Sequence, residues 1–287
     1  MEDGGDCMKI AISVETAADL TKEIIDRYDI KVVPFAIQLG DKSCLDGEIT
    51  TDDIISFVNE NKVLPKTSAV NAFQYTEHFN EILKEYDAIV HFSLSSKLSL
   101  ACANSKSVAK DMPNVFVVDT LSLSTGIALL ALYAKELVDI GHDAKEIYDL
   151  CVKRIDKIQA SFELKRLDYL YKGGRCSGLV YFGANLLKIR PQIIVKDGKM
   201  ISGKKYRGNF SHVVNKYCED VLEEFSTPDL TRAFVTYTTA SEEIVNTAKK
   251  CLEDRGFKEI LVTRAGGTIT SHCGEDCLGI LYINDGE

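Results

Sequence analysis

Hydrophobic and polar positions along residues 9–157 predict strands and helices in alternation. Two continuous apolar runs, 88–94 and 115–120, are typical of strands buried on both faces, as in a parallel sheet. Residues 71–86 instead carry apolar side chains at helical spacing. This alternation predicts a parallel sheet with helices on both faces. The remaining elements predicted in this half are strands at 9–14 and 32–39 and helices at 17–29, 50–61, 124–140 and 143–157.

Residues 158–287 show a different order of elements, which predicts a second domain. Residues 191–206 predict a β-hairpin, because Asp197-Gly198 fits a tight two-residue turn. A hairpin mixed with helices is typical of an α+β domain with a mixed or antiparallel sheet. The other predicted elements are strands at 158–164, 232–238, 259–264 and 278–284, helices at 211–225 and 241–255, and two short helices around Gly173 and Gly174.

The predicted fold is therefore α/β with two domains. A tail over residues 1–8 precedes a parallel-sheet α/β domain over 9–157, and an α+β domain follows over 158–287. The most apolar segment, 126–138, has 13 residues, which is too short to cross a bilayer. We interpret this segment as a buried helix and expect no integral membrane association.

The amino-acid composition indicates which binding partners and which cellular compartment to expect. The chain has 34 Lys and Arg against 43 Asp and Glu, a formal net charge of −9. This charge argues against nucleic acid binding and against electrostatic binding to anionic membranes. Nine irregularly spaced cysteines without a CxxC pair predict reduced thiols in a cytoplasmic protein.

Several familiar motifs are incomplete or missing from the sequence. Residues 198–205 nearly match a Walker A loop, but Lys205 replaces the Ser or Thr that would hold magnesium, and the segment lies in a predicted hairpin. Neither a GxGxxG after the first strand nor a GxSxG elbow occurs. Residues 272–277 hold one His and two Cys, too few for a metal site. We therefore predict no nucleotide, metal or other cofactor.

Hydroxyl side chains gather at two connections of the first domain. Ser95, Ser96 and Ser99 follow a buried strand and open the next predicted helix, where free N–H groups and the helix dipole favour an anion. Simple helix capping by serine explains the same pattern equally well. Thr67 and Ser68 lie in the loop before helix 71–86 and could reach the same sheet edge.

The stretch LDYLYKGGR places two adjacent glycines between Lys172 and Arg175. Backbone freedom beside fixed positive charge is typical of a bound anion. A glycine after a basic last turn is also a common helix end. The sequence leaves both interpretations of Gly173 and Gly174 open.

Taken in order along the chain, nine stretches resemble the DegV family, a bacterial group that includes the fatty acid-binding subunits of fatty acid kinase. The resemblance runs from about residue 9 to 284. It implies two α/β domains with a long-chain fatty acid in a buried tunnel between them, no catalytic residues, and a separate kinase subunit that makes the acyl phosphate. The stretches are VETAADL, VVPFAIQL, DGEIT, PKTS, SSKLS, VVDT, LDYLYKGGR, LLKIRP and SHCG.

The resemblance also implies which residues form the site. Its carboxylate-binding positions fall on Thr67, Ser95, Ser96 and His272, with lower weight on Ser68 and Ser99. Its glycine-basic segment falls on Gly173, Gly174 and Arg175, which we expect to contact the partner subunit or the transferred phosphate.

Two departures from the family pattern affect this expected site. Leu100 and Ala101 stand where the family usually has Gly and Thr, and Leu100 is expected to narrow the pocket entrance or change the acyl preference. Glu275 and Asp276 replace Pro and Gly and are expected to bring negative charge near the carboxylate.

The residues leave two alternatives to fatty acid presentation. One is a hydrolase of acyl esters, with Ser95 and His272 as its core and Asp119 as the orienting acid. The other is a binder of some other amphipathic anion.

Overall fold

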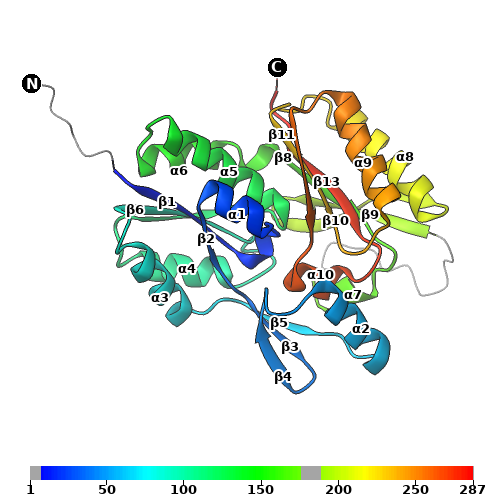
Figure 1. Ribbon diagram of the computed structural model, residues 1–287, viewed down its shortest axis with the longest axis horizontal. Helices are drawn as coiled ribbons and strands as arrows, with labels where there is room; N and C mark the ends of the chain where they lie inside the picture. The colour runs from blue at the N-terminus through cyan, green and yellow to red at the C-terminus, as the bar shows by residue number, and fades with distance from the viewer. Residues whose placement is uncertain (1–7, 176–188, 287) are drawn as a thin grey trace, which may run out of the picture.

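The computed structural model describes residues 8–175 and 189–286 and contains three sheets (Figure 1). The first is a parallel sheet with strand order β2-β1-β6-β7, which confirms the predicted parallel sheet. Every residue of β1 and of β6 is buried, as is typical of central strands in a parallel sheet covered on both faces. The strands are β1 (Ile10–Glu15), β2 (Ile30–Val33), β6 (Ala88–Ser93) and β7 (Val115–Asp119).

Helices cover both faces of the parallel sheet, with α3 and α4 on one face and α5 and α6 on the other (Figure 1). Helix α3 begins at a capping box in which Asn71 and Gln74 satisfy each other's backbone N–H groups. The helices around the parallel sheet are η1 (Thr16–Ala18), α1 (Lys22–Tyr28), α3 (Ala72–Ile82), α4 (Ala101–Ala109), α5 (Thr125–Asp139), α6 (Ala144–Lys153) and η2 (Ile155–Lys157).

The second sheet is mixed, with strand order β10-β9-β8-β13-β11-β12. Only the β11–β12 pair is parallel, so the predicted mixed sheet of the second half is confirmed. Helices α8 and α9 pack side by side over it (Figure 1). The elements are β8 (Ile158–Glu163), β9 (Ile189–Lys196), β10 (Lys199–Arg207), α8 (Phe210–Glu224), β11 (Arg232–Tyr237), α9 (Glu242–Arg255), β12 (Glu259–Arg264) and β13 (Leu278–Ile283).

Helix α5 packs between the two sheets in a shared hydrophobic core, while the face of the mixed sheet that α8 and α9 cover has a core of its own. Helix α5 contacts β1 and β6 of the parallel sheet and β8, β11 and β13 of the mixed sheet. Burial on nearly all sides explains why 126–138 is the most apolar stretch of the sequence. Among the described residues, no helix combines the length and apolarity needed to cross a bilayer.

The hairpin predicted around Asp197-Gly198 is present between β9 and β10. Asp197 has φ 51° and Gly198 has φ 77°. Positive φ at both turn residues is the requirement of a type I′ turn, which asparagine, aspartate and glycine satisfy best. The near match to a Walker A loop therefore lies in a turn and strand, away from any helix N-terminus.

The single strand predicted at 32–39 is wrong, because the chain changes sheets at Pro34. Strand β2 ends at Val33, since proline has no N–H to continue the ladder. The N–H of Phe35 instead bonds to Oγ1 of Thr16 at 3.1 Å. The chain then forms a small antiparallel sheet of order β4-β3-β5, made of β3 (Ala36–Leu39), β4 (Lys42–Leu45) and β5 (Lys66–Ser68).

Two further expectations about local structure need correction. Residues 66–68 were expected in a loop but form β5, paired with β3. The helix expected to open at Ser95–Ser99 begins only at Ala101, and its N-cap, Leu100, makes no side-chain capping bond. The second short helix expected after Gly174, and most of the tail over 1–8, lie outside the described residues.

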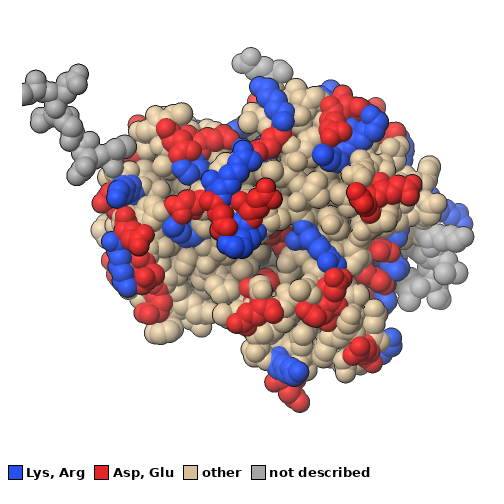
Figure 2. Space-filling view, viewed as in Figure 1, with Lys and Arg blue, Asp and Glu red and all other residues tan. Residues whose placement is uncertain are grey.

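Helices α2 (Thr51–Asn61), α7 (Asp168–Lys172) and α10 (Gly267–Cys273) gather beside the small sheet (Figure 1). Helix α10, which the sequence pattern did not predict, contacts β3, β5, α2 and α7. Elements from both halves of the sequence therefore meet around α10. Charged side chains of both signs are interspersed over the face shown in Figure 2.

Candidate functional site

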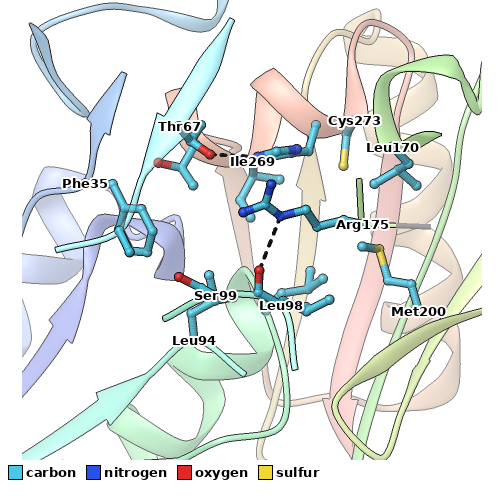
Figure 3. A pocket seen from close by; sticks show the side chains of 14 residues that line it. Phe35, Thr67, Leu94, Leu98, Ser99, Leu170, Arg175, Met200, Ile269 and Cys273 are labelled. Carbon is cyan, nitrogen blue, oxygen red and sulfur yellow. Dashed lines mark hydrogen bonds between the residues drawn. The ribbon is translucent and has the colours of Figure 1, made fainter. Parts of the chain in front are cut away.

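A cavity lies where the parallel sheet, the small sheet and the mixed sheet approach one another (Figure 3). The space free of atoms between its walls is about 530 Å³, a figure that includes open solvent. Most of the wall is apolar, and a few polar side chains interrupt it, as is usual for a small-molecule site. The lining residues are Phe35, Thr67, Ala69, Leu94, Leu98, Ser99, Leu123, Leu170, Arg175, Met200, Thr268, Ile269, His272 and Cys273.

The polar part of the wall is built on a bond between β5 and α10. Oγ1 of Thr67 lies 2.8 Å from Nε2 of His272. Burial, and then the positive charge of Arg175, lower the pKa of His272 to about 4. The imidazole is therefore neutral at neutral pH and carries a single proton.

The hydrogen-bond partners of His272 indicate which ring nitrogen carries the proton. Nδ1 is buried and has no hydrogen-bond partner among the described residues. A proton on Nδ1 would be a buried donor without an acceptor, so burial favours the proton on Nε2, which donates to Thr67. The hydroxyl hydrogen of Thr67 is then free to be donated into the cavity. Thr268 also lines the cavity, and its Oγ1 is buried without a partner in the described chain.

The two glycines after α7 serve different purposes. A Cβ on Gly173 would lie 2.6 Å from Nδ1 of His272, so only glycine leaves room for the imidazole. Gly174 has φ 72°, and nothing lies within 4 Å of a Cβ placed there. Its left-handed backbone ends the helix. Gly174 therefore fits the helix-end interpretation, while Gly173 leaves room for the imidazole of His272.

Arg175 reaches from the end of α7 into the cavity, beside Leu98 (Figure 3). Its Nε donates to the carbonyl oxygen of Leu98 at 3.3 Å, and its Nη1 donates to that of Gly173 at 2.8 Å. Two backbone acceptors thus hold a half-buried cation at the cavity wall. A positive charge beside the hydroxyl of Thr67 makes this end of the cavity suitable for an anion.

Two aspartates from the first half of the chain hold the N-terminus of α10. Oδ1 of Asp19 accepts from the N–H of Gly266 at 2.7 Å. The two oxygens of Asp46 accept from the N–H groups of Gly267 and Thr268 at 2.8 and 3.0 Å. These three N–H groups have no partner within the helix itself. The two carboxyl groups, which we call the α10 clamp, therefore fix the helix that carries His272.

Neither clamp residue was identified from the sequence, although both lie in stretches that carry the family resemblance. Asp19 is fully buried, and burial raises its pKa to about 8, against the lowering effect of bonds from Ser124 and Gly266. The neighbouring negative charge of Asp46 raises it further. At neutral pH Asp19 is therefore mostly protonated in the folded protein.

Comparison with known proteins identifies the family. The family model described as uncharacterised protein, DegV family, matches residues 9–285. The chain belongs to the DegV family.

Relatives of this DegV chain include proteins that bind fatty acids or lipids. A fatty acid-binding protein of Thermotoga maritima is 31% identical, with 95% of this chain and 96% of that protein covered. A fatty acid-binding DegV family structure from Thermus thermophilus has a TM-score of 0.87 at 26% identity and covers 96% of this chain and 100% of its own. A DegV lipid-binding protein structure from Thermotoga maritima has a TM-score of 0.86 at 26% identity, with 98% and 100% covered. The two-domain fold is thus the DegV fold.

The serines expected at the carboxylate lie in different places in this DegV chain. Oγ of Ser95 is buried away from the lining and donates to the carbonyl oxygen of Gly198 at 2.8 Å. Ser96 and Ser68 are exposed and do not line the cavity. Ser99 does line it, and its Oγ accepts from the N–H of Ala101 at 3.2 Å. The cavity therefore brings together Thr67, Ser99, Arg175 and His272, but not Ser68, Ser95 or Ser96.

The departures from the family pattern lie away from the cavity wall. Nζ of Lys165 pairs with Glu275 at 3.0 Å and with Asp276 at 3.3 Å. Asp276 also pairs with Arg190 at 3.4 Å. The acidic pair is thus neutralised outside the lining. Leu100 is 71% exposed and does not line the cavity, so the expected narrowing of the entrance by Leu100 is wrong.

The residues proposed for an ester hydrolase do not form a catalytic group. His272 bonds to Thr67, while the hydroxyl of Ser95 donates to a backbone carbonyl. Asp119 accepts from the backbone N–H groups of Ser96 and Leu121. A nucleophile, its base and an orienting acid must contact one another, and these three side chains contact other partners.

Proposed function

We propose that this protein binds a long-chain fatty acid in the cavity, with the carboxylate beside Thr67 and Arg175 and the acyl chain along the apolar wall. The observation that carries the proposal is a mostly apolar cavity whose wall holds the Thr67–His272 bond and Arg175. There the Thr67–His272 bond leaves a hydroxyl hydrogen to donate, and Arg175 supplies the positive charge. The fatty acid-binding and lipid-binding relatives support the same ligand.

The two parts of such a ligand contribute differently to affinity. Burial of a CH₂ group stabilises by about 0.8 kcal/mol, so about 15 methylenes contribute on the order of 12 kcal/mol before the costs of binding. A hydrogen bond to a charged group contributes about 1.5–3 kcal/mol. The apolar wall therefore provides most of the affinity, while Thr67 and Arg175 fix the orientation of the acid.

Protein purified from a bacterial host is expected to carry a long-chain fatty acid in close to equimolar amount. Burial of the acyl chain makes its release slow, so the ligand should survive purification. Denaturing extraction followed by lipid mass spectrometry measures it. A protein free of lipid that also fails to bind C14–C18 acids added at micromolar concentration contradicts the proposal.

The Thr67→Val variant tests the head-group end of the site. Valine keeps the shape of threonine but removes the hydroxyl, so affinity for the acid should fall about 10- to 150-fold. Affinity for the methyl ester of the same acid should hardly change. Ser68→Ala is the matched control, because this neighbouring hydroxyl on β5 is exposed. Equal losses for acid and ester would show that Thr67 acts through packing alone.

We further propose that the bound acid is presented to a separate kinase subunit, which forms the acyl phosphate. The family resemblance supports this step, and the site adds a guanidinium at the polar end of the cavity. Arginine suits both a carboxylate and a phosphate, because its planar donors match their oxygen atoms. Gly173 leaves the space beside His272 that this arrangement requires.

Arg175→Ala is expected to weaken fatty acid binding and to remove most acyl-phosphate formation with a fatty acid kinase subunit and ATP. The reason is the loss of the positive charge beside the carboxylate. Lys172→Ala is the matched control, because it removes an exposed charge from the last turn of α7, three residues away. If Arg175→Ala binds fatty acid and forms acyl phosphate as the wild type does, Arg175 takes part in neither step.

A further inference from the structure

The turn of the β9–β10 hairpin packs against the segments that follow β6 and β7. Oγ of Ser95 donates to the carbonyl oxygen of Gly198 at 2.8 Å. A Cβ on Gly198 would lie 2.6 Å from Oγ of Ser95 and 3.0 Å from side-chain carbons of Lys97 and Leu121. Gly198 is buried, although the residue on each side of it is exposed. Its φ of 77° and this close approach both require glycine.

The backbone of Ser95 is held by bonds that do not involve its hydroxyl. The N–H of Ser95 donates to the carbonyl oxygen of Ser122 at 3.0 Å. The carbonyl oxygen of Ser95 accepts from the N–H groups of Leu98 and Ser99 at 2.9 and 3.1 Å. The hydroxyl accepts from the N–H of Lys97 at 3.2 Å and donates its own hydrogen to the hairpin. Removal of Oγ therefore leaves the three backbone bonds in place and breaks the bond to the second domain.

The hairpin places Met200 in the wall of the cavity. Met200 is 4% exposed and follows Gly198 by two residues on β10. Figure 3 shows it on the side of the cavity opposite Thr67. Among the lining residues of the described chain, Met200 alone comes from a strand of the mixed sheet. In that sheet β10 is an edge strand bonded to β9, so the contact with the first domain restrains a strand that has one neighbour.

We propose that Ser95 is a positioning residue for the bound fatty acid, because its bond to Gly198 keeps the hairpin closed and Met200 over the acyl chain. This inference rests on the proposed fatty acid binding. Leu94 and Leu98, on either side of Ser95, line the same cavity. The bond therefore joins the two parts of the wall that cover the acyl chain. Loss of one neutral hydrogen bond changes an equilibrium about 3- to 10-fold, so the hairpin should open more often by that factor.

The first measurement follows the hairpin itself in the ligand-free, full-length protein. Amide hydrogen exchange over residues 196–200 should be about 3- to 10-fold faster in Ser95→Ala than in the wild type. Exchange in β11 and β13 should not change, which shows that the variant is folded. Ser96→Ala is the matched control, because this neighbouring serine is exposed, and it should exchange as the wild type does.

The second measurement follows release of a bound C16 fatty acid, and of its methyl ester, to excess albumin. Release of both ligands should be about 3- to 10-fold faster in Ser95→Ala, because Met200 covers the acyl chain and the effect lies in dissociation. Met200→Ala should also accelerate release. Addition of Ser95→Ala to Met200→Ala should then change the release rate little, since the two residues act through one contact.

The possible results separate this inference from the proposed function. Faster release of the acid alone would mean that Ser95 contacts the carboxylate, and it overturns the positioning role. Faster hairpin exchange with unchanged release of both ligands also overturns it, while leaving fatty acid binding intact. Unchanged exchange in Ser95→Ala would show that the bond to Gly198 does not hold the hairpin. A wild-type protein that binds no fatty acid contradicts the proposed function and, with it, the role in retention.

Discussion

The Gly173→Ala variant is expected to lose carboxylate recognition. The new Cβ would lie 2.6 Å from Nδ1 of His272 and 2.9 Å from the carbonyl oxygen of Tyr169. Such a contact must displace the imidazole, which separates it from Thr67 and leaves the hydroxyl without its partner. Overpacking of this kind costs about 1–3 kcal/mol of folding stability. Fatty acid affinity should fall by about tenfold or more, the effect of losing a hydrogen bond to a charged group.

The neighbouring glycine gives a matched control. Gly174→Ala imposes a side chain on a left-handed backbone but meets nothing within 4 Å. It should therefore cost about 1–2 kcal/mol of stability and hardly change fatty acid affinity. A histidine titration by NMR distinguishes the two variants directly. The pKa of His272 should stay near 4 in Gly174→Ala and rise toward the ordinary value in Gly173→Ala. Equal affinity losses in both variants would mean that Gly173 acts only as a helix end.

The sequence predicted the strands and turns that depend on only a few adjacent residues. Buried apolar runs gave β6 and β7, and Asp197-Gly198 gave the hairpin turn, because each depends on a few adjacent residues. Pro34 divides an apolar run between two sheets. This outcome could not be predicted locally, because it depends on the pairing of β2 with β1 and of β3 with β4. Helix α10 carries Thr268, Ile269 and Thr270 in succession, β-branched residues that do not indicate a helix. Its position depends instead on the α10 clamp.

The candidate site was only partly predictable for the same reason. Thr67, Arg175 and His272 were identified through the family resemblance, and all three line the cavity. The bond from Asp46 to α10 joins residues 221 positions apart, and no local pattern indicates it. Ser95 was placed at the carboxylate because it follows a buried strand, yet its hydroxyl bonds to a hairpin 103 residues further along the chain. Contacts of this range require the three-dimensional fold.

Four buried groups with shifted pKa values determine how folding stability should depend on pH. Burial raises the pKa values of Asp19 and of Glu163 to about 8. Burial lowers the pKa of His78 to about 3 and that of His272 to about 4. The carboxyl groups favour the folded state at low pH, because the fold keeps protons that the unfolded chain releases above pH about 4. The histidines oppose folding at low pH, because the unfolded chain binds their protons below about 6.5.

The sum of these effects predicts a folding stability that is nearly constant between pH about 4.5 and 6 and falls at higher pH. Between pH about 4.5 and 6, two carboxyl groups and two histidines act in opposite directions and nearly cancel. Above pH 6.5 the histidines are neutral in both states, so only the carboxyl groups act. Stability should then fall by up to about 1.4 kcal/mol per pH unit for each of the two protons, until pH about 8. Urea unfolding at a series of pH values measures this slope.

The Asp19→Asn and Glu163→Gln variants assign that slope to its two groups. Each replacement removes one of the two groups that bind a proton in the folded state but not in the unfolded state. Each single variant should therefore show about half of the fall in folding stability between pH 6.5 and 8, and the double variant should show almost none. Glu77→Gln, on the exposed face of α3, is the control and should keep the wild-type slope. A wild-type slope that persists in the double variant would assign the pH dependence to other groups and leave the α10 clamp without a role in it.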